Sequence, residues 1–577
     1  MRRSLTALLA FSICSASAFA SGRLSIDIKG LEGDLEANAK AWVEPLDKSG
    51  YTDSPAARMN VEKAVRLSLR ALGYYQPAVS MTMKNKRTLE VTVVPGEPVL
   101  ISNVDVRVTG PGADERYFRL LQKYKLPKTG SVLNHADYES FKNNLSNISM
   151  QLGYFDAEFV KSELGVSIPL NKAVWSIDYE TGERWRFGDV TFTGSQIDED
   201  ILRNMIPFKT GDYYNADTLG DFNQKLASTG WFKSAVVAPD FQSARDAGST
   251  ELPMTCEMTP RAANVFEVGL GYATDTGPHA KFGWQKPWIN SRGHSLSSST
   301  EISSDEQVLN VSYRVPVADN PAEEYWLAQN ALKHESVNDT DSNNVTVAIS
   351  RNWEFATGWQ RSIGAHIMYD SFTQGGVSND TMLVYPGISF SRTRSRGGMM
   401  PFWGDTQRYS IDTGTHYLGS DVDFIILQAQ GAIIRTPWRG HRFVARANAG
   451  KIKTSSFDQV PPDLRFFAGG DRSVRGYKYK SISPKDSEGR LTGASAMATA
   501  SIEYQYNVTG KWWTAVFFDI GDAGNSFANF TWKKGAGAGI RWNSPVGPVK
   551  LDIAKPIRPS ADDDDGLQFY IGLGAEL

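Results

Sequence analysis

The chain has 577 residues, which is too long for one ordinary hydrophobic core and predicts several domains. Its formal net charge of -3 gives no basic surplus, so we expect no nucleic-acid partner. A mean hydropathy of -0.34, together with 51 glycines, 15 tryptophans and 22 tyrosines, argues against a bundle of membrane helices and favours β-strands with interfacial aromatic residues.

Residues 1–20 have the pattern of a secretory signal peptide. Arg2 and Arg3 precede an apolar run, and small residues lead to Ala20, after which we expect cleavage. Cys256 is then the only cysteine of the mature chain and has no partner for an intramolecular disulfide. No later apolar run approaches the roughly 18 residues of a spanning helix, so the sequence favours either a soluble protein or a barrel.

Three similar units follow the predicted signal peptide. In each, a helical pattern ends at a glycine that an aromatic residue follows, and a strand pattern comes next. These glycines are 80 and 77 residues apart along the chain, at Gly73, Gly153 and Gly230. A strand that ends in glycine opens each unit. We therefore predict three β-α-α-β-β domains, at residues 22–101, 102–186 and 187–262.

The rest of the chain, residues 263–577, is an array of alternating segments separated by Gly, Asn, Asp and Pro clusters. At about 20 residues for a strand and its connection, the array accommodates about sixteen antiparallel strands, each near the length of a tilted membrane strand. One face of the segments is apolar and the other is polar or small, which is the pattern of a transmembrane β-barrel. Two packed soluble sandwiches are the alternative.

A connection of roughly forty residues, about 453–494, interrupts the strand array. Its central stretch holds four aromatic residues and a Gly469-Gly470 pair, a composition that predicts a loop folded back into the barrel and not a disordered one. Arg475 remains charged wherever it lies, so its burial requires carboxylate partners. A surface turn with a solvated arginine is the alternative interpretation of Arg475-Gly476-Tyr477.

The two strands after this loop offer such carboxylates. Side chains alternate between the faces of a strand, which places Glu503 on the same face as Thr499 and Ser501. Asp519 is likewise in phase with Ala515 in the next strand. We predict that Arg475 pairs with Asp519 and Glu503 inside the barrel.

The first and last strands of the array, about 265–273 and 567–577, carry glycines in phase on the predicted inner face. They are Gly269 and Gly271 in the first strand, and Gly572 and Gly574 in the last. Each glycine costs about 0.5 to 1 kcal/mol relative to alanine in a strand. We therefore predict that the barrel closes weakly where these strands meet, at a seam. Alternatively, the glycines only make room for the loop.

The sequence contains no recognisable catalytic or metal-binding motif. Its seven histidines are scattered, and none stands at metal-ligand spacing from another. We find neither a nucleophile-elbow serine nor a phosphate-cradling glycine loop with lysine. We expect a protein that is not an enzyme and that needs no metal or cofactor.

Taken together, the sequence resembles the outer-membrane assembly superfamily, which joins POTRA domains to a membrane barrel, and most closely its TamA-type members. The most specific matching segments are 463–480, 503–507, 518–521 and 544–548. The resemblance makes Arg475 the loop arginine, with Glu503 and Asp519 as its partners in the barrel wall. One departure is the end of the chain, Ala575-Glu576-Leu577, which lacks the aromatic residue common at outer-membrane termini.

The resemblance implies a barrel in the cell outer membrane, POTRA domains in the periplasm, and an insertase function toward β-rich membrane proteins such as autotransporters. The implied partners are unfolded outer-membrane protein clients, outer-membrane lipids, and a large TamB-like protein anchored in the inner membrane. The last of these is expected to dock on the first repeat, around Leu24 to Val99. The alternatives are a two-partner secretion transporter, which usually has two repeats, and a passive structural barrel or porin.

Overall fold

The computed structural model describes residues 25–48, 53–85, 87–273, 277–545, 547–559 and 566–573. The predicted signal peptide, Leu24 and Gly574 therefore lie outside the described residues. The chain forms two compact units: one contains the first two repeats, the other contains the barrel, and segments of the third repeat belong to each. No helix among the described residues is long and apolar enough to cross a membrane.

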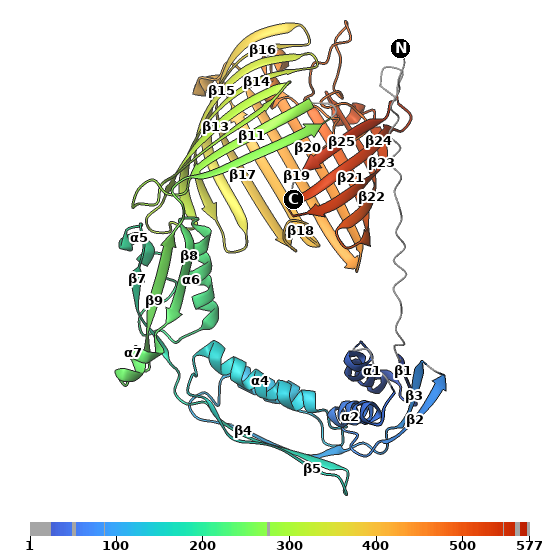
Figure 1. The fold of residues 1–577 in the computed structure, drawn as a ribbon. Helices are drawn as coiled ribbons and strands as arrows, with labels where there is room; N and C mark the ends of the chain where they lie inside the picture. Colours follow the sequence, from blue (N-terminus) through green and yellow to red (C-terminus); the bar gives the residue numbers. More distant parts are fainter. Residues whose placement is uncertain are drawn as a thin grey trace, which may run out of the picture. The chain divides into compact units, whose positions relative to one another are not determined.

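The first repeat packs two helices against a small sheet (Figure 1). Its elements are β1 (Ser25–Lys29), α1 (Gly33–Lys48), α2 (Pro55–Ala71), β2 (Ala78–Asn85) and β3 (Thr88–Val94). The strand order is β1-β3-β2, with β1 parallel and β2 antiparallel to β3. Ser54 caps α2 by accepting a hydrogen bond from the Ala57 amide, and Val65 and Leu69 of α2 pack on Leu89.

The second repeat has the same order of elements. They are β4 (Leu100–Thr109), α3 (Arg116–Lys125), α4 (His135–Leu152), β5 (Glu158–Ser167) and β6 (Lys172–Glu180), with strand order β4-β6-β5. Helix α4 ends at Gly153, whose φ of 87° is the left-handed conformation that glycine tolerates. The core of this repeat surrounds the fully buried Trp175.

The third repeat adds a short helix that the sequence pattern did not predict. Its elements are β7 (Arg186–Thr193), α5 (Glu199–Arg203), α6 (Ala216–Ser228), β8 (Phe232–Pro239), α7 (Phe241–Asp246) and β9 (Glu251–Pro260), and the added helix is α7. The strand order is β7-β9-β8. Cys256 of β9 is buried, and burial raises the pKa of its thiol to about 11, so the thiol stays protonated at neutral pH.

Sixteen antiparallel strands, β10 to β25, form the second part of the structure, and each pairs with the next along the chain. This order confirms the predicted fold class and strand number. The strands are β10 (Val265–Ala273), β11 (Gly277–Lys286), β12 (Ser295–Ser303), β13 (Glu306–Pro316), β14 (Glu324–Val337), β15 (Thr340–Glu354), β16 (Trp359–Gln374), β17 (Val377–Arg396), β18 (Trp403–Gly414), β19 (Phe424–Trp438), β20 (His441–Thr454), β21 (Ala496–Thr509), β22 (Trp512–Gly524), β23 (Lys533–Ser544), β24 (Gly547–Pro556) and β25 (Gln568–Leu573). Four short 3-10 helices lie in the connections: η1 (His416–Leu418), η2 (Phe457–Gln459), η3 (Pro462–Leu464) and η4 (Phe527–Asn529).

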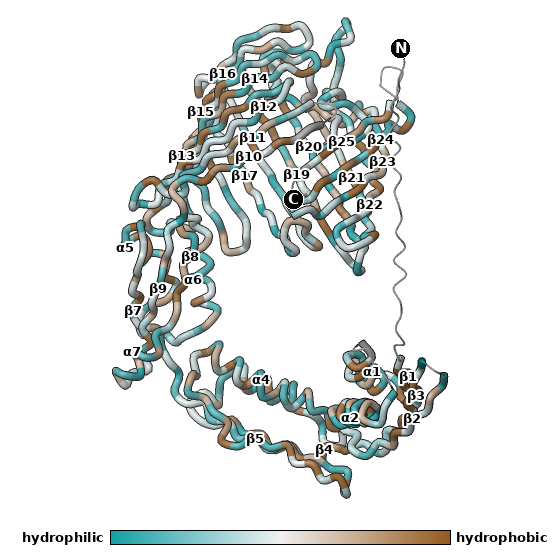
Figure 2. Tube along the Cα trace, in the orientation of Figure 1, coloured by the Kyte–Doolittle hydropathy of each residue, from teal (hydrophilic) through white to brown (hydrophobic). Residues whose placement is uncertain are grey.

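In β21, polar side chains face the interior of the sheet and apolar ones face outward. In β21, Ser501, Glu503 and Gln505 are buried, whereas Ile502 between them is 56% exposed. Hydrophobic and hydrophilic residues are also interleaved along other strands of this sheet (Figure 2), although β16, β17 and β19 carry apolar residues on their inner face as well. Because a soluble sandwich buries its apolar face, this inverted pattern supports a membrane barrel.

Backbone pairing among the described residues is uneven around the wall. Strands β16 and β17 share sixteen paired residues, whereas β10 and β11 share nine, and β24 and β25 share six up to Leu573, where the described part of β25 ends. The first and last strands approach each other to within 8 Å between Cα atoms, and no ladder joins them within residues 265–273 and 568–573. Within the described part of the wall, backbone pairing is therefore smallest around β25.

Candidate functional site: the lumen loop and its anchors

The connection between β20 and β21, residues 455–495 and here called the lumen loop, packs on the inner face of the wall. Its buried apolar residues form one cluster with inward-facing residues of β16, β17 and β19. The members from the loop are Val460, Phe466, Ala468, Val474, Tyr477, Ile482 and Ala494, and those from the three strands are Met368, Leu383, Tyr385, Phe424 and Ile426. Isolated bridges at Phe466 with Ala494 and at Ala468 with Ile482 hold the loop together.

Arg475 is almost completely buried, and its guanidinium contacts both predicted carboxylates. It donates to Asp519 through Nε at 2.7 Å and Nη2 at 3.0 Å, and its backbone amide donates to the same carboxylate at 3.0 Å. Its Nη1 donates to Glu503 at 2.8 Å. The guanidinium also stacks on Phe517, with 3.3 Å between Cζ and the ring centroid.

Two further charged residues complete this group, and the sequence analysis did not assign them a role. Arg541 of β23 donates to Glu503 at 2.7 Å and also binds Asp552 of β24. Asp552 in turn accepts from Arg475 Nη1 at 3.2 Å. We call Arg475, Arg541, Glu503, Asp519 and Asp552 the arginine anchor. Arg541 lies in phase with the inward glycines of its strand, so the alternation already placed it inside.

Arg442 of β20 balances the charge of this buried group, to which Gln505 links it. Gln505 donates to Glu503 at 2.7 Å and accepts from Arg442 at 2.6 Å, so the network contains three guanidinium and three carboxylate groups. Burial alone would lower the pKa of Arg475, but its hydrogen bond to Asp519 and the surrounding carboxylates outweigh this and hold the pKa above its ordinary value. Arg475 therefore stays charged in the lumen.

The residues after Arg475 connect the lumen loop to the last strand. Gly476 has a φ of 100° and donates its amide to the Tyr570 hydroxyl of β25 at 3.0 Å, and that hydroxyl donates to the Tyr477 carbonyl at 3.1 Å. A Cβ on Gly476 would lie 2.8 Å from the carbonyl carbon of Lys555, and one on Gly535 would lie 1.8 Å from the Arg475 oxygen. These two glycines are required for the backbones to come this close.

A second ionic group holds the loop against β14, on another part of the wall. Lys480 of the loop binds the carboxylate of Glu335, which Lys333 Nζ also approaches to 2.7 Å. Lys333 donates to Asp463 of the loop at 2.7 Å as well. Lys480 has a φ of 53°, a conformation that costs a non-glycine residue free energy and persists because its surroundings fix it. We call Lys333, Glu335, Asp463 and Lys480 the lysine anchor.

Arg465 joins the beginning of the lumen loop to its end. Its guanidinium donates to the backbone carbonyls of Val460 at 2.7 Å, Asp458 at 2.8 Å and Thr492 at 2.7 Å. Burial lowers the pKa of Arg465 to about 10, so the group is still charged at neutral pH. Arg465 thus fixes the loop's own shape, while the two anchors fix its position.

The structure shows which way two of the predicted seam glycines face, Gly269 and Gly572, and both lie on the inner face. In β10 the residues on either side of Gly269 are more than 70% exposed, so Gly269 faces inward, and in β25 Gly572 is in phase with the buried Tyr570. Gly271 lies within β10. A Cβ would meet only Lys281 at Gly269 and only Lys550 at Gly572, at ordinary distances of 3.6 Å and above. Neither glycine makes room for the loop.

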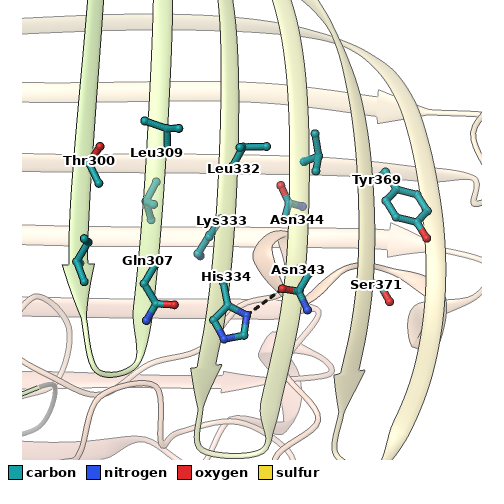
Figure 3. A pocket seen from close by; sticks show the side chains of 13 residues that line it. Thr300, Gln307, Leu309, Leu332, Lys333, His334, Asn343, Asn344, Tyr369 and Ser371 are labelled. Atoms are coloured by element: carbon teal, nitrogen blue, oxygen red, sulfur yellow. Dashed lines mark hydrogen bonds between the residues drawn. The ribbon is translucent and has the colours of Figure 1, made fainter. Parts of the chain in front are cut away.

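A separate cavity of about 490 Å³ lies on the wall between β12 and β16 (Figure 3). Its apolar lining includes the outward-facing Leu309, Leu332 and Tyr369, and His334 is hydrogen-bonded to Asn343 over 3.0 Å. These side chains point away from the lumen loop, but Lys333 of the lysine anchor also lines the cavity, so β14 separates the cavity from the loop site. Among the residues that the structure describes, no group of three potential ligands could hold a metal ion.

Arg475→Ala or Asp519→Ala should weaken the attachment of the lumen loop. Arg475→Ala leaves the buried Asp519 carboxylate without its arginine, and Asp519→Ala removes the carboxylate that accepts three hydrogen bonds from Arg475. Breaking a buried pair costs about 3 to 5 kcal/mol in comparable cases. We expect a lower temperature for the loss of heat-resistant gel mobility and faster proteolysis of the loop. Arg472→Ala is the matched control, since Arg472 lies in the same loop and is exposed. Wild-type heat and protease resistance in both anchor variants would show that the arginine anchor is dispensable.

Lys480→Met should release the loop on its β14 side and leave the arginine anchor intact. Glu335 then keeps only Lys333 as its cation, and we expect a loss of about 1 to 3 kcal/mol, as for a buried charge that loses one hydrogen-bonded partner. Protease cleavage near residues 478–490 measures the release. The exposed Lys485→Met serves as the control, and equal cleavage in the two variants would contradict the proposed second attachment.

Comparison with known proteins agrees with this architecture. The profile of the Omp85 superfamily domain matches residues 262–577, that of POTRA domain TamA domain 1 matches residues 25–95, and that of the surface antigen variable number repeat, a POTRA family, matches residues 185–252. These matches confirm the resemblance to the outer-membrane assembly superfamily.

Two relatives align with parts of the chain. Outer membrane protein assembly factor BamA of Nitratidesulfovibrio vulgaris is 27% identical over 226 residues, which are 37% of this chain and 28% of that protein. Outer envelope protein 80, chloroplastic, of Arabidopsis thaliana is 22% identical over 492 residues, which are 77% of this chain and 63% of that protein. The chain thus spans less than two thirds of the length of either relative.

A solved structure shows the same fold. BamA from Haemophilus ducreyi lacking POTRA domains 1-3 superposes with a TM-score of 0.66 at 16% identity, covering 82% of this chain and 99% of that one. A barrel of this kind preceded by POTRA domains lies in the outer membrane with those domains in the periplasm, as predicted. Because the superfamily profile matches more than half of the chain, the chain belongs to the Omp85 superfamily.

Proposed function

We propose that the chain is a non-enzymatic assembly factor that helps β-rich membrane proteins, such as autotransporters, to insert into the outer membrane. Membership of the Omp85 superfamily and a first repeat of the TamA type support this proposal. The observation that carries it is the uneven wall: within the described residues, backbone pairing is smallest between β24 and β25, next to the predicted seam with β10. A weak closure gives a client strand a place to enter.

The mechanism is strand exchange and needs no chemical step. An opened seam exposes backbone donors and acceptors to the bilayer, where no water satisfies them. A client strand that pairs with these edges removes that cost, in the same way that an extended peptide adds to a free sheet edge. Gly269 and Gly572 favour opening, because glycine contributes neither packing nor conformational restriction to a strand.

The lumen loop controls the same part of the wall. Tyr570 of β25 is held by Gly476 and Tyr477, directly after the arginine of the anchor. Movement of the loop therefore changes the support of the last strand, and movement of that strand strains the loop. We infer that the arginine anchor sets how readily the seam opens.

The first repeat is the proposed docking site for a TamB-like partner anchored in the inner membrane. In its sheet, β1 and β2 form the two edges, and each pairs only with β3 among the residues that the structure describes. An edge strand presents backbone groups that a partner strand can pair with. Unfolded clients carry the same kind of extended segment.

A disulfide between β10 and β25 should abolish assembly of a client barrel, and reduction should restore it. Cysteine pairs scanned along residues 266–270 and 569–572 identify the positions that cross-link. The background carries Cys256→Ala, although the raised pKa of this buried thiol already makes it a poor competitor. The measurement is the heat-modifiable folding of an autotransporter barrel in vesicles.

A cross-link between β16 and β17 is the matched control, because these strands are already paired over sixteen residues and the disulfide leaves the seam free. Full activity of the seam-locked protein would exclude strand exchange at this site. Such an outcome, joined to a steady open conductance in planar bilayers, would favour a transporter that passes its substrate through the lumen.

The predicted boundary at residue 101 falls inside β4 of the second repeat, so the deletion that removes only the first repeat is residues 22–98. It should leave a folded barrel that no longer binds its partner. The physical reason is that this repeat has its own core, in which both helices and all three strands take part. Co-purification with the TamB-like protein from cells measures docking, and heat-modifiable mobility checks the barrel. Partner binding that survives the deletion would move the docking site to another part of the chain.

A further inference from the structure

Six arginines lie side by side on the outer wall, at the end of the barrel where the chain enters from the repeats. They occupy four of the five adjacent strands β15 to β19, with none on β18. They are Arg351 in β15, Arg361 in β16, Arg392, Arg394 and Arg396 in β17, and Arg435 in β19. We call this set the interfacial belt.

Strand alternation shows that the belt faces outward. Arg351 is in phase with Ile349, Arg361 with Ile363, and the other arginines with outward apolar residues of their strands, all of which are about half exposed. The arginines therefore lie beyond the apolar band, toward the end of the barrel at which the chain enters. This is the level at which headgroups meet the hydrocarbon of a bilayer.

Tryptophans between the arginines hold their guanidinium planes in place. Arg361 lies 4.0 Å from the Trp353 ring centroid, and Arg392 lies 4.6 Å from that of Trp359. Arg435 lies 4.7 Å from that of Trp403, with Arg394 and Arg396 also on this ring. Stacking fixes the plane of a guanidinium and leaves its edge available for hydrogen bonds.

Carboxylates offset only part of the belt's charge. Asp405 is buried between Arg394, at 2.8 Å, and Arg392, at 3.8 Å, and Arg351 is paired with Glu324. Six arginines and two carboxylates leave a formal charge of +4. Within the described residues, Arg361, Arg396 and Arg435 have no ion pair, and the Nε atoms of Arg361 and Arg392 are buried without a hydrogen-bond acceptor.

The same level of the wall is built differently over β20 to β23. There the outward positions carry aromatic rings without arginines: Phe443 packs on Tyr504 at 5.1 Å between centroids, and Trp512 stacks on Trp542 at 5.6 Å. An ordinary interfacial girdle needs only such aromatic residues. The charge confined to β15–β19 therefore calls for a separate explanation.

We propose that the interfacial belt binds the phosphodiester headgroups of anionic phospholipids in the periplasmic leaflet. A guanidinium presents paired donors to phosphate oxygens, and the tryptophans place these donors at headgroup depth. The net positive charge attracts anionic lipid, whereas the apolar residues beyond each arginine contact its acyl chains. This site is separate from the lumen loop and from the seam.

Native mass spectrometry of the full chain, released from micelles with equal amounts of phosphatidylglycerol and phosphatidylcholine, tests the proposal. The wild type should retain phosphatidylglycerol in preference to phosphatidylcholine. Arg361→Gln with Arg396→Gln should reduce this preference by about fivefold for each arginine removed, the size expected for one basic residue at an anionic surface. The matched control is Arg408→Gln, which lies in β18 on the inner face.

Heat-modifiable mobility checks that each variant is folded. Should the glutamine pair fail to fold, Arg361→Lys with Arg396→Lys keeps the charge but loses the planar stacking, and it should retain part of the preference. Inorganic phosphate added to the micelles should not displace the lipid, since the acyl chains contribute to its binding. An unchanged lipid preference in the folded glutamine variant, or equal retention of both lipids by the wild type, would overturn the proposal.

Discussion

The burial of Arg475 is the constraint on which the arrangement inside the barrel depends. A guanidinium cannot be neutralised, so its removal from water is tolerable only where carboxylates surround it in good geometry. Asp519, Glu503 and Asp552 come from three different strands, so the loop lies where these strands bring them together. The close approach of the Arg475 carbonyl to β23 then requires Gly535.

The two anchors make the lumen loop a brace across the wall. The lysine anchor attaches it to β14, whereas the arginine anchor and Tyr570 attach it to β21–β25. The seam between β10 and β25 lies between these two regions in the strand order. The lumen loop therefore connects the two parts of the wall that flank the seam, where no ladder joins the described residues of β10 and β25. These attachments can hold the seam together although the loop adds no strand to the sheet.

The sequence alone predicts the features that depend on a local period. Alternation places Glu503 and Asp519 on the inner face, and the strand patterns predict sixteen strands, because both follow from the two-residue repeat of a strand. It does not predict pairings between distant strands, since these depend on register. Lys480 and Glu335 are 145 residues apart, and no local pattern joins them. The helix α7 was missed for a different reason: six residues are too few for a helical period to be visible.

The chemical character of the outer surface changes around the wall, as the extent of backbone pairing does. The long, extensively paired strands β15–β17 carry most of the interfacial belt, whereas β23 and β24, close to the seam, carry outward apolar and aromatic residues. An arginine at the edge of a moving strand would be drawn through the hydrocarbon as the seam opens, at a cost of a few kcal/mol for each charge. Arginines that bind lipid headgroups can therefore lie only on strands that keep their position while the seam opens. Confinement of the arginines to β15–β19 thus leaves the region of the seam free to separate.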